Sequence, residues 1–169
     1  MSEPNIDHAL AADVDWLLNR VWLGFGEARA QALEPLDLTV REHVLMSVLR
    51  STDATQLELA SITRVDKSVL TTTIDSLERK GYVVRRVDDK DRRAKRPQLT
   101  PQGIAVCIEA DRVSAQTQAR LLELVAPGIR DEFVGALREL ALGPFAATVS
   151  FSQSAERPKR TQKHRDGEL

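Results

Sequence analysis

Apolar residues recur at steps of three and four positions through most of this chain, which is the spacing of amphipathic helices. The first such stretch runs from residue 7 to about residue 33 and places Leu10, Val14 and Leu17 on one face. Pro35 ends the stretch, because proline does not fit the interior of a helix. The pattern predicts a long first helix whose apolar face packs on the protein's own core.

Capping signals divide the stretch after Pro35 into three shorter helices. Thr39–Glu42 and Thr55–Glu58 each place a threonine three residues before a glutamate, the spacing of a capping box in which both side chains satisfy backbone N–H groups. Asp66 is a suitable N-cap for a third helix, and Lys80–Gly81 is typical of its end. We therefore expect three consecutive helices.

The period changes from helical to extended after Gly81. Tyr82–Val87 is rich in β-branched residues, and Arg96–Leu99 can return antiparallel to it, with a charged tip over 88–95. Pro97 cannot donate a hydrogen bond to a neighbouring strand, so the second strand is expected at an edge. The sequence therefore predicts a small β-hairpin.

Helical spacing returns after the hairpin. Thr100–Pro101 combines an N-cap with a proline at the first helical position, and the spacing then continues to about Val125. Pro127–Gly128 interrupts it, and a further amphipathic helix is expected over Ile129–Leu142. The expected fold class is mainly α with a small β-hairpin.

Length and composition restrict the kind of protein this is. The 169 residues suit one domain, which we expect over 1–144, followed by a polar, basic tail over 145–169. The single Cys107 excludes an intramolecular disulfide, and three scattered histidines give no metal-ligand spacing, so neither metal nor cofactor is expected. No apolar run reaches the length of a membrane span and the N-terminus lacks a signal-peptide core, so we expect a cytoplasmic protein without membrane contact.

The sequence also lacks the motifs of common enzyme classes. It has no glycine-rich phosphate loop, no nucleophile elbow and no histidine near a pair of carboxylates. Asp88, Asp89 and Asp91 lie on an arginine-rich hairpin tip, where burial is not expected to raise the pKa of a carboxylate. We do not expect an enzyme.

Charge is sorted along a chain whose formal net charge is only −1. The stretch Arg79–Arg96 holds nine basic and three acidic residues, a net charge of +6, whereas residues 1–34 carry −4. The basic stretch follows two helices joined by Thr63–Val65, which form a helix-turn-helix. A basic edge beside a helix-turn-helix is typical of phosphate binding on DNA. A solvated turn rich in Lys and Arg is the alternative.

Three segments between about residues 39 and 103 carry a more specific signal. They are LTVREHVLMSVL, TQLELASITRVDKSVLTTTIDSLERKGYVVR and DDKDRRAKRPQLTPQG. Together they resemble the MarR family of bacterial transcriptional regulators, and Asp91–Arg93 with Leu99–Gly103 looks like the family's wing signature. The resemblance implies a winged helix-turn-helix at about 39–100, flanked by long dimerisation helices at about 7–33 and 101–142. It also implies a symmetric dimer on a pseudo-palindromic site, often released by a small, frequently aromatic, anionic ligand.

The helix that begins at Asp66 is expected to read DNA bases. Its inward stripe is Leu70, Ile74 and Leu77, and the N-terminal half of such a helix enters the major groove, where Ser and Thr reach base edges. The family often has a basic residue near Thr72, and this chain has none there, so fewer charged base contacts are expected. A polar face without a target is the alternative. The residues expected at DNA in this helix and the turn before it are Arg64, Lys67, Ser68, Val69, Thr71, Thr72 and Ser76.

The hairpin tip is expected to contact the minor groove and the phosphates. Arg93 is the minor-groove candidate, and Asp91 can hold its guanidinium in a bidentate pair. Arg92, Lys95 and Arg96 are then expected to meet phosphates. The alternative is a surface ion pair without a target.

The first helix carries a second apolar stripe nearly opposite its main one. Trp16 and Leu23 lie one heptad apart on this stripe, together with Ala9 and Ala12. A second apolar stripe on a helix that already packs on its own core indicates a partner chain. We therefore expect Trp16 and Leu23 at the interface of a homodimer.

The signal for ligand sensing is weaker. The resemblance implies an effector pocket between the first helix, the second helix and the long helix after the hairpin. Trp22, His43 and Met46 are candidates for its lining, with ordinary packing in the core or at an interface as the alternative for each. Cys107 is expected to be a buried, inert thiol.

These observations predict a sequence-specific DNA-binding transcriptional regulator, with a repressor as the favoured form. Its expected partners are double-stranded DNA, a second copy of itself and a small aromatic or anionic effector. The alternative is a winged-helix module for protein recognition, such as an anti-repressor, against which the basic hairpin argues.

Overall fold

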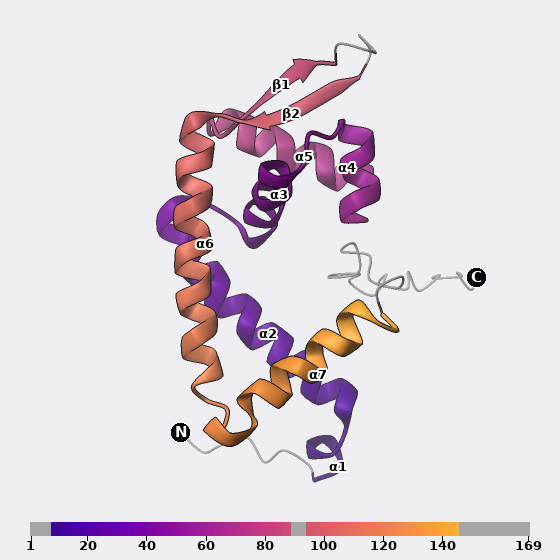
Figure 1. The fold of residues 1–169 in the computed structure, drawn as a ribbon, viewed down its shortest axis with the longest axis vertical. Helices are drawn as coiled ribbons and strands as arrows, with labels where there is room; N and C mark the ends of the chain where they lie inside the picture. Colours follow the sequence, from indigo (N-terminus) through magenta and orange to yellow (C-terminus); the bar gives the residue numbers. More distant parts are fainter. Residues whose placement is uncertain (1–7, 89–93, 146–169) are drawn as a thin grey trace, which may run out of the picture.

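The computed structural model describes residues 8–88 and 94–145 and is drawn as a ribbon in Figure 1. It consists of helices and one two-stranded antiparallel sheet, so the expected fold class, mainly α with a small β-hairpin, is confirmed. The elements in chain order are α1 (His8–Ala11), α2 (Val14–Leu33), the 3-10 helix η1 (Glu34–Leu36), α3 (Val40–Ser51), α4 (Gln56–Thr63), α5 (Lys67–Arg79), β1 (Val83–Val87), β2 (Lys95–Leu99), α6 (Pro101–Leu122), the 3-10 helix η2 (Pro127–Ile129) and α7 (Arg130–Leu142).

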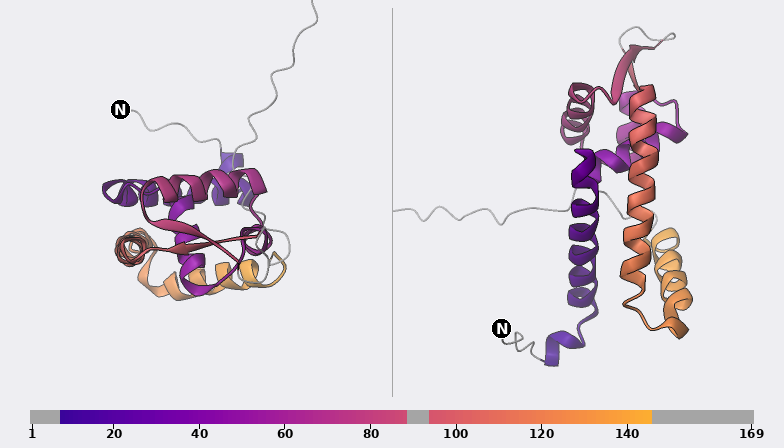
Figure 2. Two further views of the ribbon diagram at one scale, coloured as in Figure 1. Left: turned by 90° about the horizontal axis from the view of Figure 1, so that it is seen from above. Right: turned by 90° about the vertical axis from the view of Figure 1, so that its left-hand side faces the viewer.

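The molecule is elongated and has two parts of different character (Figure 1). α3, α4, α5 and the hairpin form one end, which we call the winged unit. α1, α2 and α7 lie toward the other end, and with α6 they make up the terminal helices. α6 runs from the hairpin past the winged unit, and α2 packs beside it, as the right-hand view of Figure 2 shows.

The hydrophobic core lies in the winged unit and where α2 and α6 join it. The stripe of α5 expected to face inward, Leu70, Ile74 and Leu77, is buried as predicted. Burying one such side chain contributes about 1.5–3 kcal/mol, so this cluster holds the helices of the winged unit together. The largest fully buried side chains are Leu33, Met46, Leu59, Leu70, Ile74, Leu77 and Cys107.

Local signals set the helix ends as the sequence predicts. Thr39 and Thr55 each form a complete capping box with the glutamate three residues later. Asp66 and Thr100 are the N-caps of α5 and α6, each accepting a hydrogen bond from a backbone N–H of the first turn. After α5 the chain turns at Gly81, whose φ of 75° lies in the left-handed region that favours glycine.

The hairpin and α6 meet very closely. β1 and β2 pair antiparallel with Val83 opposite Leu99, and Pro97 lies in the second strand of a two-stranded sheet, where both strands are edges. A Cβ atom on Gly103 would lie 2.0 Å from the carbonyl oxygen of Tyr82. Only glycine therefore fits at this position in the first turn of α6.

The predicted single helix over 7–33 is interrupted, so that prediction is wrong in its first part. α1 ends at Ala11, and α2 begins at Val14. Asp13 has an extended backbone, and its carboxylate accepts the N–H of Trp16 at 3.0 Å. An N-cap side chain in this position starts a new helix, so the helix breaks at Asp13 even though the helical spacing of apolar residues continues through it.

The apolar face of the first helix is exposed, which also contradicts the prediction. Val14 is 67% exposed, and Leu17 and Val21 are each exposed by at least two fifths. Leu33 is the single buried residue among those of α2, and no residue of α7 is buried. Much of both stripes of α2 therefore lies open to solvent in the single chain, although Trp16 and Phe25 are half-buried.

Candidate nucleic-acid interface

α4 and α5 form the expected helix-turn-helix. Arg64 ends α4 with a left-handed φ of 50°, and Asp66 begins α5 two residues later. Hydrogen bonds from the hydroxyl and the backbone N–H of Ser68 lower the pKa of Asp66. An ionised carboxylate is favourable here because the N-terminus of a helix carries partial positive charge.

The structure brings most of the expected base-reading residues to one side of α5, opposite the buried stripe. The N-terminal half of α5 is where such helices approach the major groove, and its exposed surface is polar. Among the residues expected at DNA, Arg64, Lys67, Ser68 and Thr72 are exposed, and Val69, Thr71 and Ser76 are half-buried.

Thr71 is tied to the neighbouring helix. The Nε2 amide of Gln56, the first residue of α4, donates a hydrogen bond of 2.7 Å to its hydroxyl oxygen. The same hydroxyl donates to the carbonyl of Lys67 at 2.8 Å. The sequence analysis did not identify Gln56. The one signal for it was its position as the first residue of α4, the first helix of the helix-turn-helix.

Ser76 and Lys80 serve the interior. Both side chains hydrogen-bond the carboxylate of Glu42, which is 3% exposed, and Lys80 Nζ lies 3.1 Å from it. Burial raises the pKa of Glu42, but hydrogen bonds from Thr39, Ser76 and Lys80 outweigh it and leave the pKa lowered. Ser76 is thus placed at the contact between α3 and α5 as well as beside the predicted DNA face.

Arg85 fixes the hairpin to α5. Its guanidinium forms ion pairs with Asp75 and Glu78, which lie three positions apart on one side of α5. The Arg85 side chain is only 14% exposed. The first strand of the hairpin is therefore held in a defined place beside the helix that is expected to read bases.

Arg96 fixes the second strand in a similar way. Its Nε pairs with the carboxylate of Asp88, and its Nη1 lies 3.7 Å from the carboxylate of Asp53 in the loop after α3. Asp88 is 4% exposed, so the expectation of an unburied carboxylate at this position is wrong. Arg96 compensates the charge of Asp88 in this buried position, and its own side chain is 23% exposed, so Arg96 is less accessible to a phosphate than the sequence suggested.

Internal ion pairs thus use part of the basic stretch. Lys80, Arg85 and Arg96 are all engaged with carboxylates. The exposed basic side chains of the described part of the hairpin and of the end of α5 are Arg79, Arg86 and Lys95. Asp91, Arg92 and Arg93 lie outside the described residues, so the minor-groove role of Arg93 and its pairing with Asp91 stay predictions.

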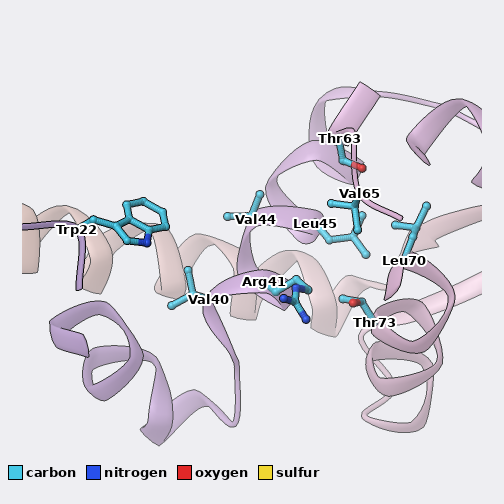
Figure 3. A pocket seen from close by; sticks show the side chains of 9 residues that line it. All are labelled: Trp22, Val40, Arg41, Val44, Leu45, Thr63, Val65, Leu70 and Thr73. Atoms are coloured by element: carbon cyan, nitrogen blue, oxygen red, sulfur yellow. The ribbon is translucent and has the colours of Figure 1, made fainter. Parts of the chain in front are cut away.

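A cavity of about 180 Å³ lies between α2 and the winged unit (Figure 3). Trp22 reaches it from α2, and Val40 and Val44 of α3 lie across from the indole ring. Its wall is mostly aliphatic, with the exposed guanidinium of Arg41 as the charged group. The lining residues are Trp22, Val40, Arg41, Val44, Leu45, Thr63, Val65, Leu70 and Thr73.

The other two effector candidates do not line this cavity. Met46 is fully buried in the core. His43 is also buried and joins α3 to α6, with its Nε2 2.8 Å from Asp111 and its Nδ1 3.4 Å from the Ser114 hydroxyl. The structure therefore separates Trp22 from His43 and Met46, which sequence reasoning had grouped together.

A polar cluster surrounds His43. Asp111 also accepts from Arg50 at 2.5 Å. Burial raises the pKa of Asp111, but hydrogen bonds from His43 and Arg50 prevail and lower it. Cys107 lies nearby and is fully buried, as expected. Burial raises the pKa of its thiol.

The described residues show neither a membrane span nor a metal site. None of their helices combines the length and apolar character needed to cross a bilayer. Among the same residues, no three His, Cys, Asp or Glu side chains gather as a metal site would require.

Comparison with known proteins agrees with this geometry. Residues 36–94 match the sequence model of the MarR family. The structure resembles a MarR family transcriptional regulator from Rhodococcus sp. RHA1, with a TM-score of 0.68 and 26% identity over 80% of this chain and 96% of that one.

Two further structures are similar and contain bound molecules. One is the transcriptional repressor CouR bound to a 23-mer DNA duplex, which matches with a TM-score of 0.74 and 26% identity over 83% of this chain and 99% of that one. CouR from Rhodococcus jostii RHA1 bound to p-coumaroyl-CoA is also similar. A MarR family protein from Mycobacterium tuberculosis in complex with p-aminosalicylic acid matches with a TM-score of 0.63 and 29% identity, over 77% and 99% of the two chains. The sequence match lies in the winged unit and the structural matches extend over the terminal helices, and on both grounds the chain resembles the winged-helix transcriptional regulators of the MarR family.

Proposed function

We propose that this protein is a cytoplasmic DNA-binding transcriptional regulator, and specifically a repressor, that binds a pseudo-palindromic site as a homodimer. The observation that carries the proposal is the placement of the exposed N-terminal half of α5 beside a hairpin that Arg85 fixes to the same helix. A helix for the major groove and a hairpin for the adjacent backbone are then held in one geometry. The similar repressor CouR in complex with a DNA duplex supports this reading.

The homodimer follows from the uncovered surface of the terminal helices. Leu23 is 57% exposed, the aliphatic residues of α2 around it are also exposed, and α7 buries none of its residues in the single chain. A soluble protein rarely leaves contiguous apolar surface of this kind open to water. A second copy related by a two-fold axis covers the same surface on both chains and also presents two winged units to two half-sites.

The cavity beside Trp22 is our candidate for the effector site. An apolar cavity of about 150 Å³ accepts a benzene ring, so a cavity of this size suits one aromatic ring. Arg41 makes no ion pair with another described residue and lies at the wall, where it can meet a carboxylate. Similar proteins bind p-aminosalicylic acid and p-coumaroyl-CoA, which supports an aromatic, anionic effector.

A DNA-binding titration tests the proposal. The protein is titrated against duplexes that it selects from a randomised pool and against random duplex, at two salt concentrations. Thr72→Ala is expected to reduce the preference for selected over random DNA, because base contacts specify the sequence. Arg93→Ala is expected to weaken binding to both kinds of duplex. Absence of any sequence preference in the wild-type protein would contradict the proposal.

The effector site is tested with p-aminosalicylic acid as a small aromatic carboxylate. The compound is expected to raise the melting temperature of the protein and to release the selected duplex. Trp22→Ala and Arg41→Ala are expected to abolish both effects while leaving DNA binding in its absence intact. Release that persists in both variants would place the effector elsewhere.

A further inference from the structure

The serine and threonine hydroxyl groups in the N-terminal half of α5 donate their hydrogen bonds to acceptors within the same segment of the protein. The Ser68 hydroxyl donates to the Asp66 carboxylate at 2.5 Å, the Thr71 hydroxyl to the Lys67 carbonyl at 2.8 Å, and the Thr72 hydroxyl to the Val69 carbonyl at 2.9 Å. Because each hydroxyl has one hydrogen, these groups then offer a ligand only lone pairs. The two threonines also offer methyl groups.

Gln56 adds a second restraint at Thr71. Its amide donates to the Thr71 hydroxyl from α4 at 2.7 Å, so this hydroxyl donates and accepts at the same time. A threonine in a helix divides between two side-chain rotamers, because in both of them its hydroxyl can reach a backbone carbonyl. The two rotamers put the methyl group in different places. The amide of Gln56 selects the rotamer in which the hydroxyl faces α4, and the position of the methyl group is then fixed as well.

The chemistry of the major groove indicates what such a methyl group can recognise. Guanine presents only acceptors there, and a hydroxyl whose hydrogen is already donated cannot bind them. Thymine presents a methyl group, which makes an apolar contact with the methyl group of a threonine. The fixed Thr71 methyl group is therefore suited to thymine.

We propose that Gln56 is a positioning residue for base recognition: by holding the Thr71 hydroxyl against α4, it fixes the methyl group through which α5 recognises a thymine. This inference rests on the proposed function, since it concerns how the same DNA face reads sequence. Gln56 acts through Thr71 and needs no base contact of its own.

The experiment removes single methyl groups from DNA. The full-length protein first selects its preferred duplex from a randomised pool. Each thymine of that duplex is then replaced in turn by deoxyuridine, which lacks the methyl group, and the affinity ratio of the two duplexes is measured. At one position of each half-site the wild-type ratio is expected to be about four, the value for burying one methyl group. Because both duplexes meet the same folded protein, a loss of folded fraction does not change the ratio.

Four variants identify the residues responsible. Thr71→Ser removes the methyl group and is expected to bring the ratio at that position to about one. Gln56→Met keeps the size of the side chain but loses the hydrogen bond, so the ratio is expected to fall below about two. Gln31→Met makes the same change on an exposed site of α2 and is expected to keep the wild-type ratio. Thr71→Val in the Gln56→Met background is expected to restore it, because the preferred helical rotamer of valine occupies both places that the threonine methyl group can take.

The outcomes separate this inference from the proposed function. If Gln56→Met keeps the wild-type ratio while Thr71→Ser loses it, Thr71 reads thymine without Gln56 and the inference is overturned. If no thymine shows a ratio above one in the wild-type protein, the inference is overturned while sequence-specific binding stands. If the wild-type protein selects no sequence at all, the proposed function fails together with it.

Discussion

Gly103 decides how closely α6 approaches the hairpin. The carbonyl oxygen of Tyr82 accepts the N–H of Thr100 at 3.0 Å and would lie 2.0 Å from a Cβ atom at Gly103. The obstacle is backbone, which cannot rotate away as a side chain can. The glycine at the end of the LTPQG segment is therefore a condition for the junction between sheet and helix.

Gly103→Ala is expected to destabilise the protein by about 1–3 kcal/mol, the usual cost of forcing additional atoms into a packed site. Gly135→Ala in α7 is the control, because no atom lies within 4 Å of the added Cβ and alanine favours a helix by about 1 kcal/mol. Urea unfolding of both variants measures the difference. Equal stability of Gly103→Ala and the wild-type protein would show that the junction can open without cost.

Arg96 and Lys95 are neighbours in the sequence with separate roles. Arg96→Ala removes the cation that neutralises the buried Asp88, so a lower melting temperature is expected. Lys95 is exposed, and Lys95→Ala is expected to leave the melting temperature unchanged while weakening binding to random duplex at low salt. Thermal melting and a DNA titration on both variants distinguish the two roles. A stable Arg96→Ala protein with weakened DNA binding would return Arg96 to the phosphate role predicted from sequence.

At the scale of elements, Glu42 joins three parts of the winged unit. It completes the capping box of α3 with Thr39, and it accepts hydrogen bonds from Ser76 of α5 and from Lys80 at its C-cap. One carboxylate thus holds the start of α3 against the end of α5. The pKa of Glu42 is lowered on balance, which makes its ionised form part of the folded state.

This pKa shift predicts a pH dependence of stability. A carboxyl group whose pKa is lower in the folded than in the unfolded protein stabilises the fold above its unfolded value, here near 4.5. As pH falls from 4.5 through the lower folded pKa, that contribution is lost, with a slope of at most about 1.4 kcal/mol per pH unit for one group. Glu42→Gln is expected to be less stable at pH 6 and to show a flatter decline between pH 5 and 3. Parallel declines in denaturant unfolding would assign the acid sensitivity to other carboxylates.

Elements were predictable where their causes are local. The capping boxes at Thr39 and Thr55 follow from residues three positions apart, and the inward stripe of α5 follows from the helical period. The ion pairs of Arg85 and Arg96 join different elements, so no short spacing reveals them, and Asp88 looked like an exposed tip residue for that reason. The contact of Gln56 with Thr71 spans the helix-turn-helix and was missed in the same way. The break at Asp13 is a local signal that the continuing apolar period concealed.

At the scale of the whole molecule, the two parts differ in how completely they bury apolar surface. The winged unit forms the core together with the adjoining parts of α2 and α6, whereas the rest of the terminal helices keep many aliphatic side chains in contact with water. The sequence predicted a partner chain on one stripe of the first helix. The structure leaves exposed aliphatic side chains on both stripes, so the surface that a second copy would bury is larger than Trp16 and Leu23 alone indicate.

Leu23→Glu is expected to convert a dimer into a monomer or an aggregate at micromolar concentration, because it places an uncompensated charge in the proposed interface. Trp16→Glu is expected to act in the same direction, although Trp16 is half-buried and has Arg20 5.5 Å above its ring. Gln102→Glu adds the same charge at an exposed polar position in the first turn of α6, at the hairpin end of the molecule, and serves as the control. Sedimentation analysis measures the result, and a monomeric wild-type protein would contradict the proposed dimer.

α6 connects these two parts as a single unbroken helix of 22 residues. A helix of this length is a stiff rod of about 33 Å, so a tilt of about 5° at one end displaces the other by about 3 Å. One base-pair step of a DNA duplex is about 3.4 Å. α6 can therefore act as a lever: in the proposed dimer on DNA, a small change of angle among the terminal helices would move the hairpin by roughly one step along the duplex, enough to put the two winged units in or out of phase with the grooves.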